Sequence, residues 1–231
     1  MSKRTLPLLT LALGIATLIA FLWLGGQPAV RAVYASNEVA PAVSAFQRAE
    51  TMQDIVLVFG YPVDEGRVAA MDALNQIDLW AFIPAYALFL SAAAIMLGGS
   101  RNRWTHIAIV FALMGAATDA IETWKQLQLT ADISNAEDHL PISPWHWLKY
   151  AALALNGVAV TSLCLTLERK RWILGVLALV PFPLVTLAYM GAISPRMFSA
   201  AFAAYWTALL AIALIETVRA TGLPARTQNP V

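Results

Sequence analysis

The sequence predicts an all-α polytopic membrane protein, a single domain spanning residues 1–231 and built around six transmembrane helices. Hydrophobic residues make up 59% of the chain and charged residues only 13%, about half the charged share of a soluble domain. Several uninterrupted apolar runs approach or exceed the roughly 18 to 20 residues that cross a bilayer as a helix. The net charge of +1 gives no indication of nucleic-acid binding, and a single cysteine excludes an intrachain disulfide.

Apolar composition, together with the charged and helix-breaking residues at the ends of the apolar runs, sets the limits of the six spans. The first span has no charged residue, the second stops at "GGSRNR" and the third closes in the acidic stretch "ATDAIETWK". Two prolines inside the fifth span, Pro181 and Pro183, predict a bend there, which a transmembrane helix tolerates when it is buried. Only "SPR" separates the fifth span from the sixth, so these two should form a helical hairpin. The predicted transmembrane helices are 5–24, 79–97, 104–124, 147–167, 172–193 and 197–215.

Lysine and arginine predict the orientation, because short cytoplasmic loops are enriched in both. With the N-terminus inside, the short loops "RNR" and "RKR" are cytoplasmic. The prediction is a bacterial inner-membrane protein with both termini on the cytoplasmic side. A cleaved signal peptide ending in "VRA" at Ala32 is the alternative, but an apolar core of about 20 residues exceeds the 7 to 15 of signals. In the orientation with a cytoplasmic N-terminus, the basic residues on the inside are Lys3, Arg4, Arg101, Arg103, Arg169, Lys170, Arg171, Arg219 and Arg226. Those on the outside are Arg31, Arg48, Arg67, Lys125, Lys149 and Arg196.

Residues 25–78 are predicted to form an extracytoplasmic helical loop, and residues 125–146 a second outer loop. Asn37 and Asp64 each precede an alanine-rich run, in the position of a helix-capping residue. In the first run Val39, Val43 and Phe46 recur at helical spacing. This apolar stripe predicts a helix lying on the membrane surface.

Four charged residues fall inside or beside the apolar runs. From a rise of about 1.5 Å per residue, Asp119 lies roughly 22 Å from the inner surface, Glu122 and Lys149 roughly 27 Å, and Asp78 about 30 Å. The four therefore share one layer at the outer boundary of the hydrocarbon, on three different spans. They are the candidate catalytic residues.

The helix dipoles predict that the acids pair with the lysine. Asp119 and Glu122 lie at the negative end of span three and Lys149 at the positive end of span four, so each opposes its own dipole. Asp119 and Glu122 are three residues apart and share a helix face, so both can meet Lys149. Asp78 either caps the second span or, if that helix begins near Asp64, lies in its middle.

Several polar residues near this layer are candidate substrate-binding groups: Tyr86, His146, Tyr150 and Asn156. Tyr86 shares a face with Asp78, whereas Asn156 lies mid-span, where a helix–helix hydrogen bond is the main alternative. His139 and His146, near Glu137 and Asp138, lack the i, i+4 spacing of a zinc site. We expect no metal and no cofactor.

Four segments resemble a broad group of small bacterial integral membrane proteins of unassigned function. They are "AFQRAETMQDIVLVFG", "ALNQIDLWAFIPAYALFL", "GAATDAIETW" and "WLKYAALAL", within residues 45–165. The group combines an Asp-to-Tyr helix, an Asp-x-x-Glu helix and a Lys-aromatic helix. The resemblance implies that the four charged positions belong together, although this chain has Thr123 where the group usually has Asn.

Three functional hypotheses follow. The first is a site for a lipophilic small molecule reached from the outer leaflet, with the carboxylates as acid or base; it predicts an apolar cavity beside the four charged residues. The second is a proton-coupled carrier. The third is an accessory or scaffold subunit with a structural ion-pair cluster, which predicts an uncovered apolar face for a membrane-protein partner. Membrane lipid is the expected surrounding, and the sequence leaves open whether the protein is an enzyme.

Overall fold

The computed structural model describes residues 5–167 and 171–222, and within these it is helical, with no strand. Six of its helical segments are long and apolar enough to cross a membrane. The predicted all-α bundle with six membrane-spanning helices is therefore confirmed. The elements are α1 (Thr5–Leu24), α2 (Pro28–Val33), α3 (Val39–Gln47), α4 (Met52–Phe59), α5 (Glu65–Ile77), η1 (Asp78–Phe82), α6 (Ile83–Gly98), α7 (Arg103–Ala131), η2 (Ile133–His139), α8 (Ser143–Thr166), α9 (Trp172–Leu179), α10 (Pro181–Tyr189) and α11 (Pro195–Thr221).

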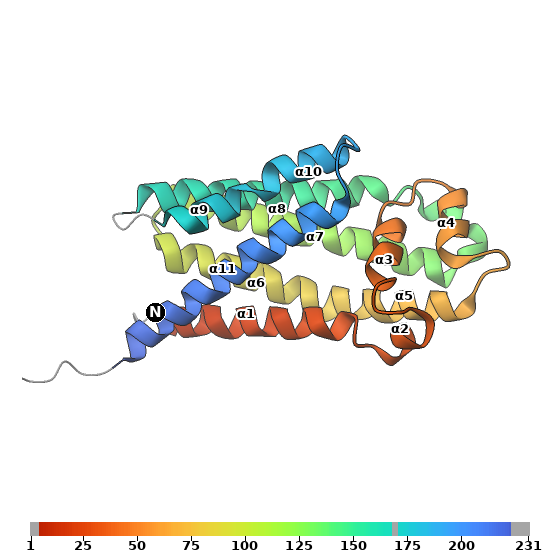
Figure 1. Ribbon diagram of the computed structural model, residues 1–231, viewed down its shortest axis with the longest axis horizontal. Coiled ribbons are helices and arrows are strands. Elements are labelled where there is room, and N and C mark those ends of the chain that lie inside the picture. Colours follow the sequence, from red (N-terminus) through yellow and green to blue (C-terminus); the bar gives the residue numbers. More distant parts are fainter. Residues whose placement is uncertain (1–4, 168–170, 223–231) are drawn as a thin grey trace, which may run out of the picture.

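The long helices form a bundle, and the short helices α2, α3 and α4 gather at one end of it with α5 (Figure 1). We call this end, with η2, the head. The unbroken helix from α5 through η1 to α6 has 34 residues and α7 has 29, so they are roughly 50 and 44 Å long. Both exceed the hydrocarbon thickness of about 30 Å. The first turns of the α5–α6 helix and the last turns of α7 extend into the head (Figure 1). The described ends of α1 and α11, Thr5 and Thr221, lie at the opposite end (Figure 1).

The third predicted span is longer in the structure, and the fifth bends where it was predicted to bend. The third was expected to end at residue 124, but α7 continues to Ala131 because "KQLQLTA" holds no glycine or proline to stop it. The fifth was expected to bend at its prolines, and it does: α9 ends at Leu179 and α10 begins at Pro181. Pro181 has no N–H to continue the helical ladder, so the axis changes direction there.

The head has a hydrophobic core of its own. Phe46 and Phe59 meet edge-to-face, with their ring centroids 5.0 Å apart, and both are fully buried beside Met71 and Leu129. The stripe of Val39, Val43 and Phe46 packs into this core. The expectation that it lies on the membrane surface is therefore wrong, because the neighbouring helices of the head cover it first.

The helix caps in the head agree only in part with those predicted from the sequence. Asp64 caps α5 as predicted, accepting a hydrogen bond from the Arg67 N–H at 3.1 Å. Asn37 does not cap α3, which begins after Glu38 without a side-chain cap. Helix α4 was not predicted, although it has a reciprocal capping box between Thr51 and Asp54.

The membrane bundle packs through small residues. Gly157 on α8 lies against the backbone of Ala178 on α9, so closely that a Cβ would collide with the Ala178 carbonyl. Gly115 on α7 leaves room for Leu153 of α8 in the same way. Away from the head, Glu216 of α11 binds Arg171 and Arg219. Of the residues behind the orientation prediction, Lys3, Arg4, Arg169, Lys170 and Arg226 lie outside the described residues.

Candidate functional site

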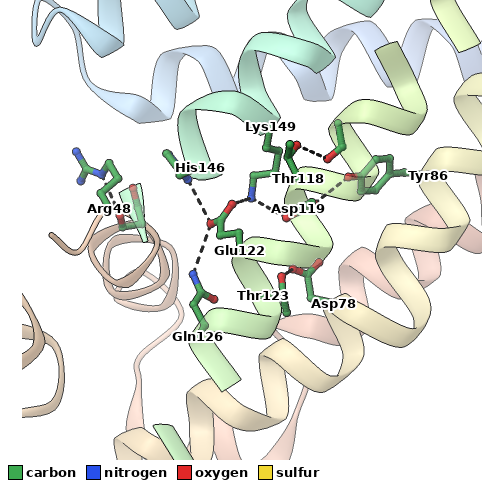
Figure 2. A network of polar contacts seen from close by, with 12 residues as sticks. Arg48, Asp78, Tyr86, Thr118, Asp119, Glu122, Thr123, Gln126, His146 and Lys149 are labelled. Carbon is green, nitrogen blue, oxygen red and sulfur yellow. Dashed lines mark hydrogen bonds and ion pairs between the residues drawn. The ribbon is translucent and has the colours of Figure 1, made fainter. Parts of the chain in front are cut away.

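A buried ion-pair network joins α7 to α8 where the bundle meets the head (Figure 2). The Lys149 ammonium lies 2.8 Å from Asp119 Oδ1 and 2.7 Å from Glu122 Oε2. We call these three residues the charge network. The predicted pairing of both acids with Lys149 is confirmed.

The sequence places these side chains together by simple helix geometry. Asp119 and Glu122 are one turn apart on α7 and share the face that packs against α8. The three side chains are at most 5% exposed. Because an unpaired charge in this environment costs several kcal/mol, the network holds α7 and α8 in one register.

Neutral side chains complete the network. Tyr86 of α6 donates its hydroxyl to Asp119 Oδ2 at 2.9 Å, so a third helix contributes. Glu122 Oε1 accepts from the Gln126 amide at 3.5 Å and lies 3.5 Å from His146 Nδ1. His146 Nε2 is buried and has no hydrogen-bond partner among the described residues.

Asp78 lies beside the charge network without an ion pair to Lys149 among the described contacts. Its Oδ2 accepts from the Thr123 hydroxyl at 3.0 Å, which ties the second membrane helix to α7. Asp78 is the first residue of the π-helical turn η1, with helix on both sides. It is therefore in mid-helix, and the alternative that it caps a helix start is wrong. Such π-turns occur frequently at functional sites.

The remaining predicted residues divide into two groups. The Tyr150 ring borders the network, with its centroid 5.1 Å from Lys149 Nζ and 4.9 Å from that of His146. Asn156 lies apart, about 10 Å further along α8. Its amide donates to the Ala108 carbonyl at 2.8 Å and its Oδ1 accepts from the Tyr205 hydroxyl at 3.0 Å. Asn156 thus forms the helix–helix hydrogen bond that was its main alternative.

Three residues of the site, Thr123, Gln126 and Trp206, were not singled out as candidates from the sequence. Gln126 lies four residues after Glu122, so the helical period alone could have found it. Trp206 of α11 stacks on Tyr86 with centroids 5.3 Å apart, and no sequence signal relates the rotation of α11 to that of α6. Within residues 5–167 and 171–222, no group of three His, Cys, Asp or Glu side chains is arranged to hold a metal ion.

Neither of two pockets within the described residues is the predicted apolar cavity, because neither is lined by any of the four charged residues. One pocket, of about 390 Å³, lies in the head between α3, α4 and Arg67 of α5. It includes Tyr34, whose hydroxyl has no partner in the described residues and whose pKa is raised by burial, although the charge of Arg67 opposes this.

The second pocket, of about 590 Å³, lies between α8 and α10 at the head end. Successive helical residues are about 100° apart, so Ala151, which lines this pocket, points to the opposite side of α8 from Lys149. The charge network and this pocket therefore occupy opposite faces of one helix. We call it the α8–α10 pocket; its lining residues are Glu50, Ser143, Pro144, Trp147, Leu148, Ala151, Val185, Thr186 and Tyr189.

Comparison with known proteins adds no relative: no family model, no curated protein and no solved structure matches the chain. Two features of the molecule therefore bear on its function: the closed charge network and the α8–α10 pocket.

Proposed function

We propose that the protein binds a lipophilic small molecule at the outer boundary of a bacterial inner membrane, in the α8–α10 pocket. The observation that carries the proposal is the pocket itself. Its volume of about 590 Å³ falls within the roughly 300 to 1,000 Å³ of small-molecule sites, which combine apolar walls with few polar groups. Leu148, Ala151 and Val185 are apolar walls, and Glu50 is a single carboxylate at its edge.

The orientation in this proposal has both termini in the cytoplasm and the head outside. Arg101 and Arg171 lie in the short connections at the end of the bundle opposite the head. Short cytoplasmic loops carry the excess of positive residues. The α8–α10 pocket is then at the level of the outer leaflet, where a molecule dissolved in lipid can reach it.

In this proposal the charge network supports the pocket and does not act on the ligand. Its charges are paired, its side chains are buried, and it faces away from the α8–α10 pocket. A network of this kind fixes the position of α8, and α8 contributes five of the pocket's lining residues. Acid–base conversion by Asp119 or Glu122 would require a ligand on the other side of α8.

A second candidate function is that of an accessory subunit of a membrane complex. The observation that favours it is an apolar patch on the head, away from the membrane-spanning segments. Leu57 is 72% exposed and Tyr61 is 89% exposed, with Val56 and Val63 beside them. Exposed apolar patches of this kind mark interaction surfaces, so a protein partner would cover this one.

Photo-crosslinking tests the first function. The protein in lipid nanodiscs is irradiated with an alkyl probe carrying a diazirine, and the labelled peptides are identified by mass spectrometry. We expect saturable labelling of residues 143–151 and 185–189. Ala151→Trp fills the pocket and should abolish it, whereas Ala117→Trp, an exposed alanine on α7, should not. Equal labelling of all lipid-facing helices, unchanged by Ala151→Trp, would overturn the proposal.

A further inference from the structure

We infer that the α8–α10 pocket selects amphiphiles with a positively charged ammonium head. This inference rests on the proposed function, since it names the ligand class of the same pocket. Three observations support it: the only charged lining residue, the pair of aromatic rings beside it, and the position of the apolar wall relative to both.

The charged residue is Glu50. The Ala49 carbonyl accepts hydrogen bonds from Ile142 N–H at 2.9 Å and Ser143 N–H at 3.4 Å. These bonds fix the neighbouring Glu50 next to the first turn of α8. Among the residues that line the α8–α10 pocket, Glu50 alone carries a charge, and its carboxylate forms no ion pair within the described part of the chain. The carboxylate at the pocket edge therefore has no ion-pair partner among the described residues, and no cationic side chain lines the pocket.

The aromatic pair is Trp147 of α8 and Tyr189 of α10. Their ring centroids are 5.3 Å apart and their planes are inclined at 78°. Tyr189 is 68% exposed, so its ring is open to a ligand. The two rings pack edge-to-face, and the exposed Tyr189 ring lines the same pocket as the Glu50 carboxylate. An aromatic face and a carboxylate are groups that attract quaternary ammonium ions, the ring through cation–π attraction.

The apolar wall gives the ligand its direction. Ser143 and Glu50 lie at the head end of the pocket, whereas Ala151 is eight residues further along α8, about 12 Å deeper. A cationic head at Glu50 would therefore leave an alkyl chain lying along Leu148, Ala151 and Val185 toward the hydrocarbon. An anionic head in the same place would meet the charge of Glu50 without a cation to offset it.

Competition for the photo-crosslinking site tests the inference. Dodecyltrimethylammonium is the cationic competitor, and dodecyldimethylamine oxide, which is dipolar with no net charge at neutral pH, and dodecanol are net-neutral competitors with the same chain. All are used below their micellar concentrations with the protein in nanodiscs. The variants are Glu50→Gln and the matched control Glu137→Gln, which removes an exposed carboxylate of the head that does not line the pocket.

The expected result is that the cation competes at least about tenfold more strongly than the net-neutral compounds in wild type and Glu137→Gln. Glu50→Gln should remove most of this preference while labelling of the pocket persists. If all three compounds compete equally, or Glu50→Gln keeps the preference, the inference is wrong and the proposed function stands. If none competes and labelling is not saturable, the proposed function fails and the inference fails with it.

Discussion

Replacing Lys149 with Met should destabilise the protein strongly, and neutralising its partners should restore it. Lys149→Met keeps the length and apolar stem of the side chain but leaves Asp119 and Glu122 buried without their cation. The triple variant Lys149→Met, Asp119→Asn, Glu122→Gln removes all three charges and keeps similar volumes.

The magnitude follows from the geometry of the charge network. Two contacts of 2.8 and 2.7 Å each give a gross attraction of about 6 kcal/mol at an effective dielectric constant of 20. Desolvation offsets much of this, and removing one partner of a buried pair costs about 3–5 kcal/mol net. At roughly 2–4 °C per kcal/mol for a chain of this size, Lys149→Met should unfold roughly 6–20 °C lower.

Thermal unfolding in detergent is the assay, followed by intrinsic fluorescence and by loss of the main peak in size exclusion. Lys125→Met is the matched control: Lys125 is on α7 one turn from the network, and none of the described ion pairs includes it. The control should change the midpoint by less than about 2 °C. A Lys149→Met variant as stable as wild type, or a triple variant less stable than the single one, would contradict the predicted role of the charge network.

Three further predictions use the same unfolding assay. Gly157→Ala should cost about 1–3 kcal/mol, because its new Cβ collides with the α9 backbone, whereas Gly175→Ala meets only ordinary contacts at 3.6 and 3.9 Å and should be near neutral; equal effects would contradict the close packing. Tyr205→Phe should cost about 0.6 kcal/mol, the average for an interhelical hydrogen bond in a membrane, and a loss above about 2 kcal/mol would contradict this. Asp54→Ala should cost about 1 kcal/mol at pH 7. Backbone hydrogen bonds lower the pKa of Asp54, so its contribution is complete above the ordinary pKa of about 3.9 and is lost as the pH falls through the lower folded value. The difference between wild type and Asp54→Ala should therefore shrink below about pH 4, and a difference that grows there would refute the assignment.

Helix periodicity and electrostatics made the charge network predictable. Asp119 and Glu122 share a face because of their spacing, and burying two acids without a cation is costly. The dipole argument was wrong in this respect, because α7 continues to Ala131 and both acids lie more than two turns before its end. The helix rise then predicted that Lys149 lies at about the same depth in the membrane as the two acids. The hydrogen bond from Tyr86 was beyond this reasoning, because depth along a helix says nothing about how α6 is rotated toward α7.

The head and the α8–α10 pocket could not be predicted from the sequence, because both depend on tertiary packing. The stripe on α3 has the same pattern whether it faces lipid or a protein core, and only the presence of α4 and α5 decides the outcome. Trp147 falls at the end of its predicted span, as aromatic residues of an interfacial belt do. Its pairing with Tyr189 arises from the bend at Pro181, whose direction the sequence does not specify.

We propose that the ligand binds on the α10 side of α8, while the charge network on the other side is structural. Native mass spectrometry of the protein purified from its host membranes tests this most directly. We predict a bound lipophilic molecule on wild type and on the triple network variant, and its loss from Ala151→Trp. A ligand that survives Ala151→Trp but is lost from the triple variant would contradict the account and locate the site at Asp119, Glu122 and Lys149.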